Sequence, residues 1–462
     1  MPHPHQQSGP GLTEGLATFA ASCTHVPAKA SDVAKTGIVN AIGLMLAART
    51  DPAVVVTNQT IGHTEASPTG GASVLLSSAH LARPTDAAFV NGTAVHAFAM
   101  DDVIWGCHPS AVLLPAILAE AERIQASGAD VLRAWVVGYE VLGEMVAREP
   151  DSLHSTGWHP TGLLGAIAAA AAVSNLLKTP AETARRAIAI AASFTGGASV
   201  NFGTQTKALH AGRAASAGVL AVQLAQAGLT ATPRALEADN GFLKMISPEG
   251  NVDITSGFNP DTPPWHILKH GICIKQYPLC YTLHRLVDAA ASLVDLHSIQ
   301  PQQVKEIDVW LGTKQATLAH HTSPQDALQA KYSVEFSVAS GLVSQTAGLA
   351  QLTPEYIRSE AMQSLMKVTR RHLMSEQSEE DPLFAPYDKI RLLMADGTVV
   401  ESEEVRYPRG HAKNPLTEDM QRRQFMESVT GVIADPEALY HALSNMEDIA
   451  DISRLRQLCN AA

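Results

Sequence analysis

The chain has few cysteines, few aromatic residues and few charged residues for its length. Its 462 residues include 5 cysteines, and only 5% are aromatic and 17% charged. The cysteines are odd in number, scattered and without CxxC spacing, which argues against a disulfide framework, a zinc site or an iron–sulfur cluster. We therefore expect reduced thiols in a cytoplasmic protein.

Signals for nucleic acids, membranes and common cofactors are also missing. The net charge is −12 and no polybasic run occurs, so we expect no nucleic-acid partner. The most apolar stretch, residues 163–173, is too short to span a bilayer, and the N-terminus has no apolar core typical of a signal peptide. The motifs HExxH, Walker A, GxGxxG and GxSxG do not occur. The sequence thus predicts no membrane association, no metal ion and no cofactor, and a serine hydrolase is not indicated.

Apolar and small residues are abundant. Hydrophobic residues make up 46% of the chain, and alanine dominates several stretches. This composition favours closely packed helices, and the length favours two large domains. We expect helices over residues 37–48, 110–124 and 129–147, and a capping box from Thr179 to Glu182 that opens another helix.

The character of the sequence changes near Pro260. Strand patterns follow at 304–311 and 390–400, where Asp396-Gly397 indicates a hairpin turn, with helices between them around 339–343 and 354–372. Helical patterns return after Asn414. The predicted fold is mostly α: a disordered segment 1–11, a discontinuous helical bundle formed by 12–272 and 413–462, and an inserted α+β domain, 273–412.

Two histidines stand directly before prolines that head long apolar segments, in His108-Pro109 and His159-Pro160. Proline is favoured at the first helical position, so both histidines should lie at helix N-termini, where unpaired N–H groups attract anions. A histidine that only caps its helix is the plain alternative. The repeated pattern indicates an anion site.

Cationic residues recur in two later segments. Lys207, His210 and Arg213 are three residues apart among small apolar residues, which favours a buried helix over a solvated basic face. The segment from Lys275 to Cys280 has the pattern of a turn before a helix, in which Cys280 would be a core residue. Buried cations need partners, and a carboxylate ligand is one candidate.

Together these segments resemble the MmgE/PrpD family, which includes 2-methylcitrate dehydratase, cis-aconitate decarboxylase and iminodisuccinate epimerase. The resemblance runs in order from about residue 12 to the C-terminus. The matching motifs are NGTAVH at 91–96, DD at 101–102, HPSAV at 108–112, GYEV at 138–141, GWHPTG at 157–162, TK at 206–207, LHAGRAA at 209–215, KxYPxC at 275–280 and AKYS at 330–333.

The resemblance implies a homodimer and a pocket between two domains, with cofactor-free chemistry on di- or tricarboxylates. By position it implies that His108, His159 and Lys207 are catalytic. We expect the substrate to be bound by Lys275, Cys280, His210 and Asp101. Cys280 falls where the family's decarboxylases carry a pocket histidine, and Ala99 and Val103 replace a polar aspartate and threonine of that branch.

The expected function is a cofactor-independent lyase, resembling 2-methylcitrate dehydratase or aconitate decarboxylase. Lys207, His159 and Lys275 would hold carboxylates, and His108 or His159 would move the proton beside one of them. The altered residues at 99 and 103 keep two alternatives open. One is an epimerase or isomerase of an amino-polycarboxylate such as iminodisuccinate, and the other is an inactive carboxylate-binding homologue.

Overall fold

A computed structural model describes residues 11–61, 70–76 and 81–460. The predicted disordered segment therefore lies outside the described residues except for Gly11. The chain divides into two compact units, one formed by residues up to Ile272 together with those from Thr417, and the other by Cys273–Leu416. Helices dominate the described residues, which confirms the prediction of a mostly α protein.

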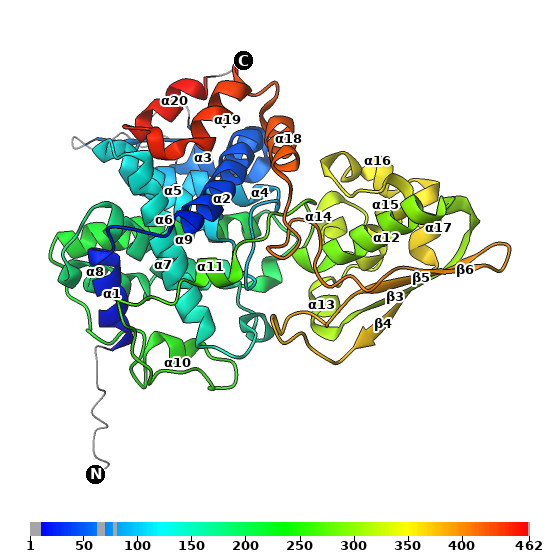
Figure 1. Cartoon of the computed structure of the whole chain (residues 1–462), viewed down its shortest axis with the longest axis horizontal. Coiled ribbons are helices and arrows are strands. Elements are labelled where there is room, and N and C mark those ends of the chain that lie inside the picture. The colour runs from blue at the N-terminus through cyan, green and yellow to red at the C-terminus, as the bar shows by residue number, and fades with distance from the viewer. Residues whose placement is uncertain (1–10, 62–69, 77–80, 461–462) are drawn as a thin grey trace, which may run out of the picture. The chain divides into compact units, whose positions relative to one another are not determined.

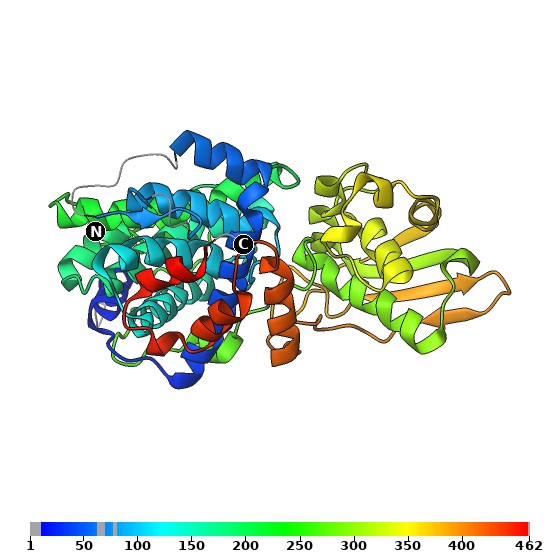
Figure 2. The ribbon, with the colours of Figure 1, turned by 90° about the horizontal axis from the view of Figure 1, so that it is seen from above.

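The larger unit is a helical bundle completed by the C-terminal end of the chain (Figure 1). Its first helices are α1 (Leu12–Ser22), α2 (Ala28–Ala47), α3 (Pro52–Ile61), α4 (Pro84–Ala97), α5 (Pro109–Ile124), α6 (Gly128–Ala147) and α7 (Pro160–Leu176). They are followed by α8 (Ala181–Ala191), α9 (Thr206–Gln226), α10 (Phe242–Ile246), α11 (His266–His270), α18 (Glu418–Val429), α19 (Pro436–Ser444) and α20 (Leu455–Leu458). Two short antiparallel strands, β1 (Ala72–Ser73) and β2 (Leu81–Ala82), form a ribbon. Helices α18 and α19 pack on α2, as Figure 2 shows from above.

Small residues let the central helices of this unit approach closely. Every residue of α7 is buried, and the helix packs against α5, α6 and α9. A Cβ added to Gly92 of α4 would lie only 2.7 Å from Cα of Gly212 in α9. The same two helices bring His96, near the end of α4, to Lys207, at the start of α9, so they run antiparallel. The glycine contact thus sets the spacing of two helices that carry polar residues.

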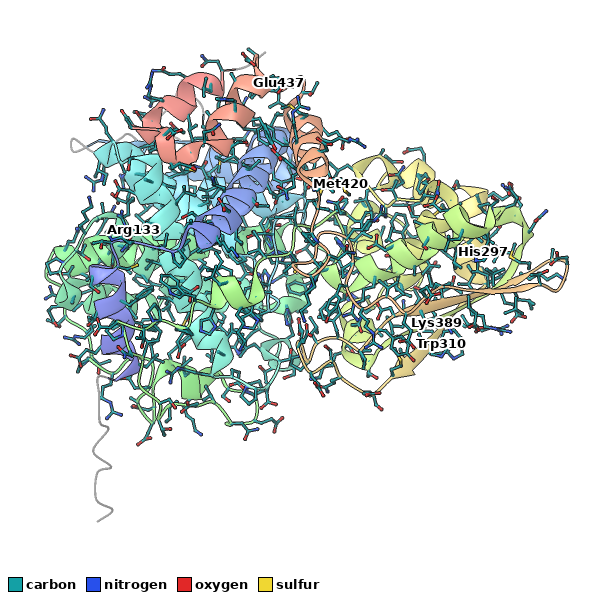
Figure 3. The ribbon with its side chains drawn as sticks, viewed as in Figure 1. Arg133, His297, Trp310, Lys389, Met420 and Glu437 are labelled. Carbon is teal, nitrogen blue, oxygen red and sulfur yellow. The ribbon has the colours of Figure 1, made fainter. Side chains whose placement is uncertain are left out.

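The smaller unit packs helices against a four-stranded sheet. The strands are β3 (Val304–Gly312), β4 (Thr369–Met374), β5 (Lys389–Met394) and β6 (Val399–Glu401), in the order β4-β3-β5-β6. Strands β3 and β4 are parallel and the other pairs are antiparallel; Trp310 and Lys389, labelled in Figure 3, are cross-strand partners on β3 and β5. The helices are α12 (His284–His297), α13 (Thr313–Leu318), α14 (Ala327–Ala330), α15 (Val334–Ser344), α16 (Pro354–Ile357) and α17 (Glu360–Lys367). Its core joins the inward faces of α12, α15 and the sheet.

The long periodic segments were predicted well. The helices predicted at 37–48, 110–124 and 129–147 correspond to α2, α5 and α6, and the strand at 304–311 corresponds to β3. The hairpin is also confirmed, because β5 and β6 pair across a turn in which Gly397 has φ +90°.

Two local predictions were wrong. Residues 369–372 form the start of β4, since pairing with β3 overrides the helical pattern that precedes them. No capping box opens α8: Pro180 occupies the N-cap, and the Thr179 hydroxyl donates to Ser174 O at 3.3 Å. The Glu182 carboxylate instead pairs with Arg185 at 2.7 Å.

Among the described residues, no helix is by itself both long and apolar enough to cross a bilayer. The helical segments Ala28–Thr50 and Pro52–Ile61 pass that test of length and composition only as a pair, across a bend of 83°.

The close contact of α4 and α9 predicts a sensitive position at Gly212. Its added Cβ would collide with Phe89 O and Thr93 Oγ1, and backbone cannot easily give way. We predict that Gly212→Ala lowers the free energy of unfolding by about 1–3 kcal/mol, a typical cost of overpacking. Chemical denaturation checks this against Gln226→Ala, at the exposed end of the same helix. Equal stability of the two variants would contradict the contact.

Candidate functional site

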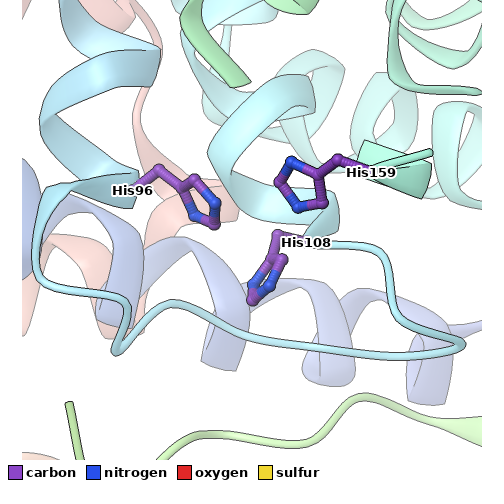
Figure 4. Close-up of side chains that lie close together, drawn as sticks. All are labelled: His96, His108 and His159. Carbon is purple, nitrogen blue, oxygen red and sulfur yellow. The ribbon is translucent and has the colours of Figure 1, made fainter. Parts of the chain in front are cut away.

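Three histidines from three separate elements meet inside the larger unit (Figure 4). His96 lies near the end of α4, while His108 and His159 are the N-cap residues of α5 and α7. All three are buried. The ring centroids lie 4.5 Å apart for His96 and His108, 5.5 Å for His96 and His159, and 6.1 Å for His108 and His159. The prediction that His108 and His159 head helices is confirmed, with Pro109 and Pro160 at the first helical positions.

Lys207 joins this histidine cluster from the first turn of α9. Its Nζ lies 2.6 Å from Nε2 of His96 and 5.6 Å from the centre of the Phe202 ring. Lys207 thus lies beside the imidazole that contacts both helix-heading histidines. The residues predicted to be catalytic therefore converge, although they are far apart in the sequence.

The carboxylate of Asp101 connects two of the imidazoles. Its Oδ2 lies 2.9 Å from Nδ1 of His96 and 2.9 Å from Nδ1 of His108. An ionised carboxylate only accepts hydrogen bonds, so both Nδ1 atoms carry hydrogen. In the neutral rings the lone pair is then on Nε2, and that of His96 accepts a hydrogen bond from the Lys207 ammonium. A continuous chain runs from Lys207 through His96 and Asp101 to His108.

Burial controls the protonation of this cluster. Desolvation lowers the pKa of His96 well below 6.5, although Asp101 opposes the shift. Burial also lowers the pKa of His159, helped by the positive charge of Lys207. For Asp101, burial would raise the pKa, but His108 and His96 together hold it well below 3.8. At neutral pH the site therefore holds the Asp101 carboxylate beside neutral imidazoles of His96 and His159.

His210 is hydrogen-bonded to His159. The Nδ1 atoms of these two residues lie 3.0 Å apart, so one ring must donate and the other accept. Burial, together with the charge of Lys207, lowers the pKa of His210 to about 4. The predicted cationic trio is therefore not confirmed: His210 is neutral near pH 7, and Arg213 is exposed on the outer face of α9, where it donates to Phe194 O.

The loop before α5 is fixed by a second carboxylate. Asp102 accepts hydrogen bonds from the backbone N–H and the hydroxyl of Ser110, each at 3.0 Å, and so caps the helix that His108 heads. Burial, with the neighbouring charge of Asp101, raises the pKa of Asp102 to about 7. The backbone carbonyl of Asp102 also accepts from Nδ1 of His108 at 3.0 Å. Asp101 and Asp102 therefore have different roles despite being adjacent.

Two of the remaining predicted residues belong to the other unit. Lys275 and Cys280 belong to the smaller unit, where Lys275 is buried and Cys280 Sγ lies 3.2 Å from the Thr282 hydroxyl. Their contacts with substrate stay predictions, as does a pocket between the units. Ala99 and Val103 are both buried beside Asp101 in the sequence, and Ala99 has φ +57°.

His96 was missed as a site residue. It was recognised only as part of the NGTAVH motif, because no proline marks it and it lies at the C-terminal end of its helix. Its spacing of five residues from Asp101 was the available signal. One nitrogen each of His96, His108 and His159 can be chosen so that all three atoms lie within 4.8 Å of one another, so these residues could hold a metal ion.

Comparison with known proteins agrees with this site. The MmgE/PrpD N-terminal domain model matches residues 14–255 and the MmgE/PrpD C-terminal domain model matches residues 277–447. The chain therefore belongs to the MmgE/PrpD family, as predicted. It is 29% identical to cis-aconitate decarboxylase of Mus musculus over 392 residues, which cover 81% of this chain and 78% of the relative. The Homo sapiens cis-aconitate decarboxylase is 28% identical over 397 residues (81% and 79%), and a cis-aconitate decarboxylase-like protein of Aspergillus oryzae is 28% identical over 405 residues (81% and 82%).

The lowered pKa of His159 predicts a pH-dependent stability. Below pH 6.5 the unfolded chain binds a proton at this imidazole and the folded chain does not, so stability falls as pH falls. When the pH falls from 7.5 to 5.5, the free energy of unfolding should decrease in the wild type by about 1.4 kcal/mol more than in His159→Gln, which has no imidazole at this position. Urea unfolding at both pH values measures this, with the exposed His441→Gln as control. Equal losses in all three proteins would contradict burial of a neutral His159.

Proposed function

We propose that this chain is a cofactor-independent lyase that decarboxylates a tricarboxylic acid of the cis-aconitate type. The relatives named above support the substrate class. The observation that carries the proposal is the contact of the half-buried Lys207 with the buried His96, beside His108 and His159. A cation next to neutral imidazoles suits a ligand with several carboxylates. Because the net charge of the whole chain is −12, such a ligand needs a local positive group to bind.

The reaction needs charge stabilisation and one proton. The bond to the departing carboxylate breaks, and its electron pair forms a new carbon–carbon double bond. The electron pair of the former double bond moves to the carbon beside a second carboxylate, and the negative charge spreads onto the oxygens of that carboxylate. Lys207 stabilises that charge, since preorganised cations in a buried site are effective there. A proton then adds to this carbon, and CO2 and a dicarboxylic acid leave.

His108 is the proton donor in this proposal. The Asp101 carboxylate accepts from its Nδ1, which directs the opposite nitrogen, Nε2, to the reaction and stabilises the protonated ring. Negative charge on an incoming substrate favours protonated imidazoles, so binding itself would charge the ring. His159, supported by His210, would hold a carboxylate. Asp101 acts through the two imidazoles and is a positioning residue.

The same groups could also remove a proton beside a carboxylate, which is the first step of dehydration and of epimerisation. Epimerisation stays the second candidate, because Ala99 and Val103, close to Asp101 in the sequence, are apolar where the decarboxylase branch has polar residues. NMR in deuterated buffer separates the outcomes. Decarboxylation releases CO2 and places one deuterium in the product, whereas epimerisation places deuterium in recovered substrate without loss of carbon. No change in any tested acid would leave only carboxylate binding.

Removal of the ammonium should abolish most of the activity. We predict that Lys207→Met lowers kcat/KM about 10²–10³-fold, because the developing charge loses its cation. The matched control is Arg213→Gln, which removes an exposed cation from the same helix and should keep activity within about twofold of wild type. Product formation followed by NMR measures both. Equal losses in the two variants would show that Lys207 acts only through overall charge.

Asp101→Asn tests the charge that stabilises protonated His108. The amide oxygen of asparagine has two lone pairs and can replace Oδ2 as an acceptor for both Nδ1–H groups, but the negative charge is lost. We predict that kcat falls about 10²–10⁴-fold, the range of an impaired acid–base group, while KM changes little. Steady-state kinetics measures both constants, with the exposed Asp239→Asn as control. A raised KM with unchanged kcat would instead assign Asp101 to substrate binding.

A further inference from the structure

We propose that His96, His108 and His159 form a binding site for a divalent transition-metal ion of the Zn²⁺ class, and that Lys207 keeps this site closed. The ammonium and the metal ion would be alternative occupants of the same place. This inference does not depend on the reaction that the chain catalyses, because it concerns binding by the resting protein.

The ligand set suits such an ion. Three imidazoles are a common set for zinc, copper, nickel and cobalt, and one nitrogen from each of these three lies within 4.8 Å of the others. Metal ligands must be neutral imidazoles. Burial lowers the pKa of His96 and of His159 well below 6.5, so neither has to lose a proton near neutral pH.

The surrounding hydrogen bonds also suit a metal site. Imidazoles that bind metals usually donate their other N–H to a carboxylate or another acceptor, which fixes the ring. Asp101 accepts from Nδ1 of His96 and of His108, and Nδ1 of His159 is paired with His210. Each ring is therefore already oriented by a neighbour. In tetrahedral sites, with metal–nitrogen bonds of about 2.0–2.1 Å, the nitrogens lie about 3.3 Å apart. Binding would therefore draw the three nitrogens closer together than the 4.8 Å within which they lie here.

Lys207 occupies the position that the ion needs at His96. Its Nζ lies 2.6 Å from Nε2 of His96 and is hydrogen-bonded to it. A metal ion bonded to the same nitrogen would have to sit on the same lone pair, about 0.5 Å closer. The two cations therefore exclude each other there, and their like charges repel. Removal of the lysine charge should open the site.

Titration with Co²⁺ tests this, because tetrahedral Co²⁺ absorbs visible light and Zn²⁺ does not. We expect Lys207→Met to bind one Co²⁺ at least tenfold more tightly than the wild type, with a tetrahedral spectrum. The matched control Lys178→Met removes an exposed lysine and should behave as the wild type. Lys207→Ala replaces Lys207→Met if the latter does not fold.

A second variant identifies the ligands. Adding His159→Gln to Lys207→Met should abolish the tetrahedral spectrum; Co²⁺ that stays bound belongs to surface histidines such as the neighbouring pair His320 and His321. The proposal is overturned if Lys207→Met binds Co²⁺ no more tightly than wild type, or if the double variant keeps the spectrum.

Discussion

A single carboxylate oxygen organises the buried polar cluster. Oδ2 of Asp101 lies 2.9 Å from Nδ1 of two imidazoles, and Nδ1 of His108 also donates to the Asp102 carbonyl, so Nδ1 carries the hydrogen in each ring. The hydrogen bond from Lys207 to Nε2 of His96 follows from this. A buried carboxylate is costly unless it is paired, and here two imidazoles and a lysine charge compensate it. The cluster depends on all of these groups together.

The packing of small residues makes this polar cluster possible. Alanine and glycine on α4, α7 and α9 bring the helix axes close, so that side chains from distant segments meet. Each helix start also contributes a histidine whose backbone is fixed by the proline that follows it. The abundance of alanine and the shortage of aromatic residues therefore serve the site as well as the core.

Much of this arrangement could be predicted from the sequence, for identifiable reasons. The two His-Pro pairs carry a local signal, since proline marks a helix start whatever surrounds it. Lys207 and His210 were recognised from their spacing, yet the spacing could not tell that Arg213 faces outward. His96 escaped because its importance comes from Lys207, 111 positions later in the chain. Residues 369–372 were misassigned for a similar reason, because only their pairing with β3 makes them a strand.

The charge balance of the cluster links binding to proton transfer. Before a ligand arrives, burial disfavours protonation of His96 and His159. An acid with three carboxylates brings more negative charge than one lysine can compensate. The imidazoles must then take up protons, because nearby negative charge raises their pKa. The proposed decarboxylation consumes one proton, so the electrostatics that would admit its substrate would also supply that proton at the reacting carbon.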